Sequence, residues 1–294
     1  MEQNDKLMKN IEMLGEKYKK EYLDFWNKKP ENNWWEALKF FFYHSFMRGR
    51  RDQLSIEYYS FAIKTLEELY INKSKDLDEA YEKLKKDGKS FNKECIIDFK
   101  KKNNIGLGNS IKHQDFKKDV ADINPIIESL ITPKKIQIKE TNKKIYLSND
   151  EDVMMVLDTL KFISENENRK NIYNYIKEQM NNDIKKVYNE LISIRAISDK
   201  IATFIIRDIG ILNPKIKIKK EDYKLAFPID TWVKQIANRL GCKSKKNNEI
   251  KNYLIKICYE SKVDPLKVAA GLWFLGTHSL DILLENCLSQ KEIR

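Results

Sequence analysis

Cysteine, histidine, glycine and proline are all scarce in this chain: its 294 residues include four cysteines, three histidines, nine glycines and six prolines. The cysteines lie far apart and form no closely spaced pair, so the sequence indicates neither a zinc site nor a disulfide framework. His113 and His278 stand too far from other ligand-type residues to bind a metal. We therefore expect reduced thiols, no metal and no cofactor.

Long apolar runs are also missing. No stretch approaches the ~18 consecutive apolar residues of a membrane-spanning helix, and the amino terminus is polar. We expect a soluble, cytoplasmic protein without a membrane partner.

The scarcity of glycine and proline leaves long stretches without helix breakers, and most windows carry apolar residues at helical spacing. The expected fold class is mainly α. An alternating stretch, Ile136-Gln137-Ile138-Lys139, and a partner at Lys144-Ile145-Tyr146 predict one small β hairpin near residues 136–147.

Composition divides the chain into three regions. Residues 1–72 are rich in aromatic side chains and predict packed helices, whereas residues 73–147 are rich in lysine and predict an insertion or subdomain. Residues 148–294 are predicted to be helical, because Ser148 and Glu151 form a capping box ahead of an apolar face. The later helices are predicted at residues 172–180, 184–192, 199–209, 231–240, 250–261 and 265–276.

Positive charge is what the chain has in excess: 55 lysines and arginines stand against 44 aspartates and glutamates, a net charge of +11. Such a charge favours polyanionic partners, nucleic acid among them. A lysine-rich proteome produces the same balance without a functional reason, so charge alone leaves the partner open.

Residues 191–200 contain a helix end, a short turn and a new helix start. Ser198 is a preferred residue for capping a helix, and Asp199 suits the positive end of the helix dipole. The amides of such a turn can hold a DNA phosphate without reading the base sequence. The same pattern also fits an ordinary helical hairpin. The candidate phosphate contacts are Arg195, Ala196, Ile197 and Ser198.

Lys200 and Asp230 each have a plain structural interpretation when taken alone. Asp230 precedes an amphipathic helix and is a common helix cap. Taken alone, Lys200 is expected to be a solvated surface lysine, because most lysines of a basic chain are.

Two motifs contain these residues: Asp199-Lys200-Ile201-Ala202 follows a hairpin, and Phe227-Pro228-Ile229-Asp230 precedes a helix. Taken together, the motifs resemble those of the helix-hairpin-helix DNA glycosylases. In that family the lysine expels the damaged base and forms a Schiff base with the sugar, while the aspartate assists. The resemblance therefore implies a glycosylase-like helical fold, with Lys200 and Asp230 as catalytic residues. It also implies base excision from double-stranded DNA with AP lyase activity, by a nucleoid-associated monomer.

Within that superfamily, the Lys200-x-x-x-Phe204 spacing and residues 263–274 are similar to the archaeal 8-oxoguanine glycosylases, over roughly the last 110 residues. That similarity implies that Phe204 and Trp273 hold the flipped base between their rings. Plain core packing is the alternative for both. In these enzymes the first helices return to line the base pocket, which makes His44 and Ser45 candidate contacts to the base edge.

The chain departs from the family pattern in three places. Ala196 and Ser198 replace the usual hairpin glycines, and Ala269 replaces the acidic residue that binds the base edge in the archaeal group. Residues 213–220 form a basic insertion between the lysine and the aspartate. The closely spaced cysteines of the iron–sulfur relatives are missing, which excludes that cluster.

Three arginines follow the first aromatic helix and are candidates to clamp phosphates: Arg48, Arg50 and Arg51. Ion pairing with Asp52 and Glu57 is the alternative. Two rival functions also remain: a non-catalytic helix-hairpin-helix protein that binds DNA without excision, and a helical protein-interaction module.

Overall fold

The computed structural model describes residues 2–47, 52–89, 130, 134–137, 144–147 and 150–279. The described residues are mainly helical, as the sequence predicts. The chain divides into two compact units, each of which gathers segments that are distant in the sequence. Unit 1 comprises residues 1–28, 176–190 and 198–294, and unit 2 comprises residues 29–175 and 191–197.

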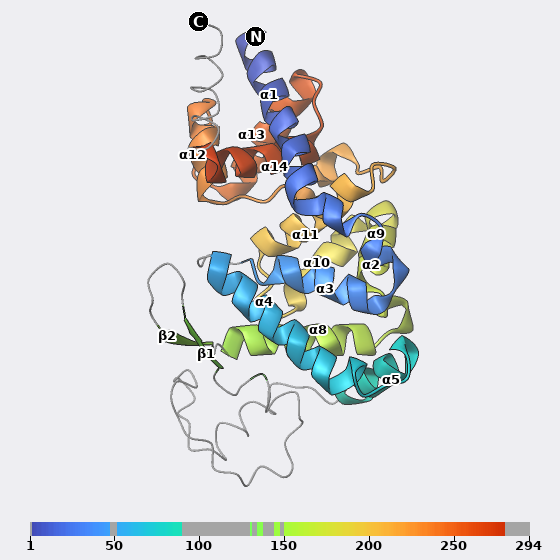
Figure 1. Ribbon diagram of the computed structural model, residues 1–294. Helices are drawn as coiled ribbons and strands as arrows, with labels where there is room; N and C mark the ends of the chain where they lie inside the picture. Colours follow the sequence, from blue (N-terminus) through green and yellow to red (C-terminus); the bar gives the residue numbers. More distant parts are fainter. Residues whose placement is uncertain are drawn as a thin grey trace, which may run out of the picture. The chain divides into compact units, whose positions relative to one another are not determined.

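Unit 1 is built from helices of both chain ends (Figure 1). The α-helices that lie wholly in unit 1 are α1 (Glu2–Tyr18), α11 (Asp199–Leu212), α12 (Thr231–Arg239), α13 (Asn247–Glu260) and α14 (Pro265–Thr277). The unit also contains the short π-helix η1 (Lys19–Leu23) and the 3₁₀ helices η2 (Asp24–Trp26) and η5 (Lys220–Ala226). Two further helices, α9 (Ile172–Asn182) and α10 (Ile184–Ser193), contribute residues to both units.

Glycines allow α1 and α14 to pack backbone against backbone, and Figure 1 shows the two helices crossing. A Cβ added to Gly271 would overlap the carbonyl oxygen of Ile11 and lie 2.9 Å from the amide nitrogen of Gly15. A Cβ on Gly15 would in turn overlap the carbonyl of Lys267. This contact fixes α14, the helix that carries Trp273.

Unit 2 holds the aromatic-rich helices and the small sheet. Its elements are α2 (Lys29–Asn32), α3 (Trp34–Ser45), α4 (Asp52–Leu66), η3 (Glu67–Ile71), α5 (Leu77–Gly88), β1 (Lys134–Gln137), β2 (Lys144–Leu147), α8 (Asp150–Ser164) and η4 (Glu167–Arg169). The side chain of Asn33 caps α3 by accepting a hydrogen bond from the amide of Glu36 at 2.9 Å. The hydroxyl of Tyr81 donates to the carbonyl of Ile163 at 2.8 Å and so ties α5 to α8.

The predicted elements of the second half agree closely with these helices. Helix α11 is longer than predicted, since it continues to Leu212. The two strands pair antiparallel, as the sequence predicts, with Ile136 opposite Ile145. Strand β1 begins and ends two residues before the predicted stretch 136–139. Ser148 lies outside the described residues, and the helix that it was predicted to cap begins at Asp150.

No helix within the described residues is long and apolar enough to cross a membrane.

Candidate functional site

The turn after α10 holds Ala196 in a left-handed backbone conformation, with φ at 64°. This conformation is strained for alanine and is normally occupied by glycine. Within the turn, the amide of Ile197 donates to the carbonyl of Ile194 at 3.1 Å, and the amide of Arg195 donates to Asp158 Oδ2 at 3.2 Å. The backbone amides of Arg195 and Ile197, two of the four candidate phosphate contacts, therefore already donate hydrogen bonds within the protein.

Helix α11 begins at Asp199, and Ser198 precedes it with extended backbone. The Ser198 side chain makes no capping hydrogen bond, contrary to the expectation from the sequence. Helix α11 instead presents the Asp199 carboxylate in its first turn, where a negative charge interacts favourably with the helix dipole.

The carboxylate of Asp199 is held by two side chains from other helices. Lys251 Nζ of α13 lies 2.9 Å from Oδ1 and 3.2 Å from Oδ2, and the hydroxyl of Tyr188 of α10 donates to Oδ1 at 2.8 Å. The Lys251 side chain is only 3% exposed. Burial, followed by the hydrogen bond to Asp199, raises the pKa of Tyr188 to about 12, so its hydroxyl remains a donor at neutral pH.

Lys200 follows Asp199 directly and is partly exposed. Its ammonium nitrogen makes no hydrogen bond or ion pair with any residue that the structure describes. In the sequence, Lys200 thus follows a residue whose carboxylate is already engaged by Lys251 and Tyr188.

Asp230 caps α12, as expected from the sequence. Its Oδ1 accepts a hydrogen bond from the amide of Val233 at 2.8 Å, and the residue is partly exposed. Phe227 and Ile229, just before it, are buried in the core of unit 1. Among the described contacts there is no hydrogen bond or ion pair between Asp230 and Lys200.

Phe204 and Trp273 are brought together by α11 and α14. Their ring centroids lie 6.3 Å apart with 64° between the planes, which is an edge-to-face contact. A base held between two rings requires the rings to be parallel and further apart. In this structure the two side chains pack against each other.

A buried ionic cluster lies beside Phe204. Arg207 Nε donates to Asp208 Oδ1 at 2.7 Å and Nη2 donates to the hydroxyl of Tyr18 at 2.8 Å, while that hydroxyl donates to Asp208 Oδ2 at 2.6 Å. The guanidinium also stacks over Phe204, 4.2 Å from the ring centroid. Its Nη1 is a buried donor without a hydrogen-bond partner among the described atoms. Sequence reasoning missed this cluster, although opposite charges inside an isoleucine-rich helix are a signal for it.

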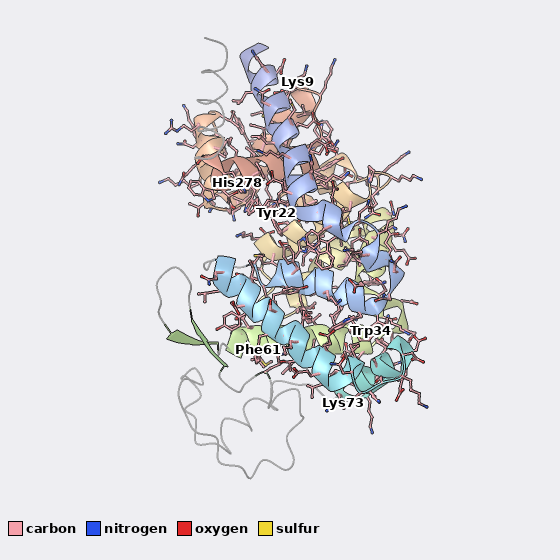
Figure 2. The ribbon with its side chains drawn as sticks, viewed as in Figure 1. Lys9, Tyr22, Trp34, Phe61, Lys73 and His278 are labelled. Atoms are coloured by element: carbon pink, nitrogen blue, oxygen red, sulfur yellow. The ribbon has the colours of Figure 1, made fainter. Side chains whose placement is uncertain are left out.

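Tyr22 and His278, both labelled in Figure 2, form a second polar pair in unit 1. The hydroxyl oxygen of Tyr22 lies 2.8 Å from His278 Nε2, and the histidine ring stacks on Phe274 at 4.3 Å. The Tyr22 ring also meets Trp273 edge-on at 5.5 Å. This pair was not predicted, because 256 residues separate its members.

His44 and Ser45 belong to unit 2 and are fully buried. His44 Nδ1 lies 2.8 Å from the carbonyl oxygen of Phe40, and Ser45 Oγ donates to the carbonyl of Phe41 at 2.8 Å. Both therefore bond within α3. Three other candidates, Arg48, Arg50 and Arg51, lie outside the described residues.

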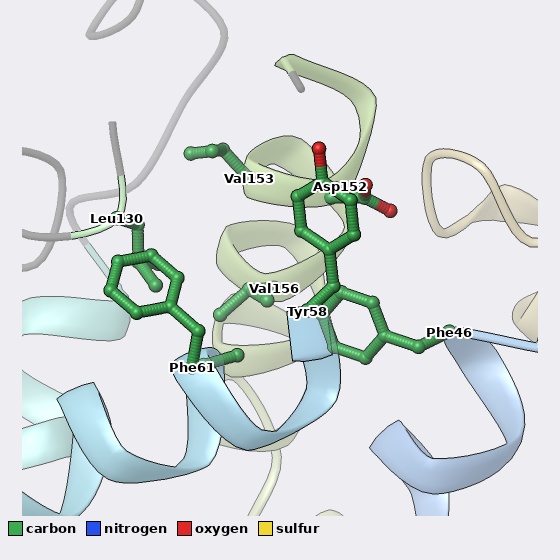
Figure 3. A pocket seen from close by; sticks show the side chains of 8 residues that line it. Phe46, Tyr58, Phe61, Leu130, Asp152, Val153 and Val156 are labelled. Carbon is green, nitrogen blue, oxygen red and sulfur yellow. The ribbon is translucent and has the colours of Figure 1, made fainter. Parts of the chain in front are cut away.

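A small hollow lies in unit 2, where Tyr58 and Phe61 of α4 face Val153 and Val156 of α8 (Figure 3). Its volume of about 20 Å³ has room for about one water molecule. An open groove of about 540 Å³ lies on unit 1 and is lined by residues that include lysines, glutamates and Tyr259. Neither is lined by Lys200 or Asp230.

Lys251 is the partner of Asp199 that sequence reasoning missed. A signal for it exists in the helical spacing, since Lys251 shares one face of α13 with Leu254, Ile255 and Cys258, all of them buried. A lysine within such an apolar stripe indicates a buried partner. Within the described residues, no group of three or more histidine, cysteine, aspartate or glutamate side chains is arranged to bind a metal ion.

Comparisons of this chain with protein-family models, with curated proteins and with solved structures give no match.

Proposed function

We propose that this protein is a base-excision DNA glycosylase with AP lyase activity and that Lys200 is its nucleophile. The observation that carries the proposal is the state of Lys200: its amine stands in the first turn of α11, partly exposed, without a carboxylate partner among the described residues. An amine paired with a carboxylate is held in its protonated form, which cannot attack. The proposed substrate is duplex DNA with a damaged base, such as the oxidised purine 8-oxoguanine.

The proposed reaction begins when the neutral amine of Lys200 attacks C1′ of a nucleotide flipped out of the duplex. The bond from C1′ to the base breaks, and the base leaves with the bonding electrons and takes up a proton. Ring opening of the sugar then gives a Schiff base between C1′ and Nζ. Loss of a proton from C2′ expels the 3′ phosphate, and water releases the sugar remnant from the lysine.

Asp230 has two roles in this scheme. Its Oδ1 is engaged by the amide of Val233, while the carboxylate charge stabilises the positive charge that develops on the sugar. It also accepts a proton during turnover. The proposal requires Lys200 and Asp230 to approach the same nucleotide once DNA is bound.

The base pocket of the proposed enzyme uses Phe204 and Trp273. Because the two rings now meet edge to face, base binding requires Trp273, which is only partly buried, to turn away from Phe204. Ala269 is fully buried on α14 and offers no acidic group to a base edge, so the preferred lesion need not be 8-oxoguanine.

The proposed DNA contacts combine the turn with the arginines. The left-handed Ala196 keeps the turn in a conformation that glycine normally supplies. Since the amides of Arg195 and Ile197 are bonded internally, the amides of Ala196 and Ser198 and the Arg195 side chain remain for phosphate binding. Arg48, Arg50 and Arg51, which lie outside the described residues, are proposed as further phosphate contacts.

Borohydride trapping tests the proposal. The purified protein is incubated with duplexes that contain an abasic site, 8-oxoguanine or uracil, and reduction converts any Schiff base into a stable adduct. We expect an adduct with wild type and none with Lys200→Gln. Lys246→Gln is the matched control, because Lys246 is 82% exposed and far from α11 in the sequence. An adduct of wild-type yield with Lys200→Gln would refute the assignment of the nucleophile.

The second candidate function is a helix-hairpin-helix protein that binds DNA without excision. The observation in its favour is the contact between Phe204 and Trp273, which fills the place proposed for a base. This candidate predicts salt-sensitive DNA binding and no adduct on any of the three duplexes.

A further inference from the structure

We propose that the exposed face of α12 binds the phosphate backbone of the DNA strand that carries the flipped nucleotide. This inference rests on the proposed function, because Asp230, at the start of α12, is assigned there to the reacting sugar. The α12 face consists of six exposed residues: Thr231, Trp232, Lys234, Gln235, Asn238 and Arg239.

The α12 face is continuous around the helix. With 3.6 residues per turn, its six side chains lie within about 160° of arc. Val233 and Ala237 point the other way and are buried in the core of unit 1, and Ile236 and Leu240 pack against the same core. One side of α12 therefore holds the helix in place, and the opposite side is exposed along its whole length.

The chemistry of the α12 face suits phosphate. Its five polar side chains all donate hydrogen bonds, and they are residue types that contact phosphate oxygens in protein–DNA complexes. No aspartate or glutamate occurs from residue 231 to residue 248. Lys234 and Arg239 make no ion pair with any part of the chain that the structure describes. Both cations are therefore available to a polyanion.

The neighbouring helix α13 has a different surface. Its exposed carboxylates Glu249 and Glu260 lie 3.2 Å from Lys246 and 3.7 Å from Lys256, respectively. Positive charge on that surface is thus largely compensated by nearby carboxylates, whereas the positive charge of the α12 face is not. This contrast favours an anionic partner at α12 in particular.

The position of Lys234 relates the α12 face to the proposed reaction. The amide of Lys234 donates to the carbonyl of Asp230 at 3.1 Å, so Lys234 lies one turn further along the same side of the helix. Four residues advance about 6 Å along a helix, close to two nucleotide steps of about 3.4 Å along one DNA strand. A strand whose sugar faces Asp230 thus has a phosphate within reach of Lys234.

Trp232 relates the α12 face to the proposed base pocket. Helix α12 lies against α14 (Figure 1), and Trp232 packs so closely on Gly276 that a Cβ added to this glycine would overlap the indole side chain. Gly276 follows Trp273 by three residues and therefore shares its face of α14. Trp232 is nevertheless 44% exposed. The α12 face thus begins beside the helix that carries Trp273.

The test is the affinity for a duplex that contains a tetrahydrofuran abasic analogue, which has no C1′ hydroxyl and so forms no Schiff base. Fluorescence anisotropy measures it at several salt concentrations. Lys234→Gln with Arg239→Gln removes two positive charges from the α12 face. We expect the affinity of this double variant to fall about tenfold or more at low salt. The slope of log affinity against log salt should become shallower by about two.

Two further double variants are the controls. Lys6→Gln with Lys9→Gln makes the same change in net charge on α1, where both lysines are exposed, and should bind nearly as wild type does. Lys234→Arg with Arg239→Lys keeps both charges on the α12 face and should retain most of the wild-type affinity. Such retention is not expected if these positions act only on folding.

The outcomes separate this inference from the proposed function. An equal loss in the α1 control, or no loss in the α12 variant, would overturn the inference and leave Lys200 as the proposed nucleophile. Unchanged duplex affinity with weaker binding of poly-glutamate would assign the face to an acidic protein and also overturn it. Absence of a borohydride adduct with wild type would instead refute excision, and a selective loss of affinity in the α12 variant would still support α12 as a DNA contact.

Discussion

At the scale of single residues, Ala196 offers a direct stability test. Its φ of 64° is strained for any residue with a Cβ. Replacement by glycine should relieve that strain and raise the free energy of unfolding by about 0.5–1 kcal/mol, after the larger freedom of glycine in the unfolded chain is counted. The measurement is urea unfolding followed by circular dichroism.

Ala202→Gly is the control for this substitution, because Ala202 is fully buried inside α11. Glycine in a helix interior should lower the free energy of unfolding by about 1 kcal/mol. Destabilisation by both variants would show that the turn around Ala196 does not have the conformation described.

The candidate residues differ in how far the sequence predicts them. The capping role of Asp230 is confirmed because it depends on a local pattern, a cap ahead of an apolar face. The ion pair of Lys251 with Asp199 was not predicted, because 52 residues separate them and no local pattern names the partner. Phe204 and Trp273 were predicted to hold a flipped base between their rings, with core packing as the alternative. Their direct edge-to-face contact was not predicted, because it depends on how α11 and α14 pack.

At the scale of helices, the contact between α1 and α14 depends on Gly271. Alanine at this position would place its Cβ on the carbonyl of Ile11 and beside the backbone of Gly15, neither of which is a flexible side chain. We expect Gly271→Ala to lower the free energy of unfolding by about 2–4 kcal/mol. Urea unfolding of the variant measures this loss.

Gly210→Ala is the matched control for Gly271→Ala. A Cβ on Gly210 would meet the terminal methyl of Leu266 at 2.6 Å, which is the far end of a flexible side chain rather than backbone. The loss should therefore be clearly smaller than for Gly271→Ala. Equal losses would contradict backbone-to-backbone packing of α1 and α14.

Helix bounds were predicted well where caps and apolar faces agree, as for α12 and α14. The sequence did not predict which helices pack against each other. Nothing near Gly15 in the sequence indicates that α1 packs on α14, more than 250 residues away, because the signal is only the absence of a side chain on both helices. Packing partners of this kind are set by three-dimensional fit rather than by local pattern.

At the scale of the whole molecule, the net charge of +11 makes ionic strength the test of DNA binding. Each phosphate neutralised by lysine or arginine releases counterions, so affinity falls as salt rises. We expect the affinity for an undamaged duplex to fall at least about tenfold between 50 and 200 mM salt. Fluorescence anisotropy of a labelled duplex measures it. An affinity that does not change with salt would favour the helical protein-interaction module.

The central claim is that Lys200 forms the covalent link to DNA, and the most direct measurement is peptide mass spectrometry of the reduced adduct. After borohydride trapping, digestion of both DNA and protein leaves a sugar remnant on the reacting lysine. We predict that this mass lies on Lys200 and is absent from Lys251 and Lys246. A remnant on any other lysine, or no remnant on any peptide after incubation with all three duplexes, would contradict the account.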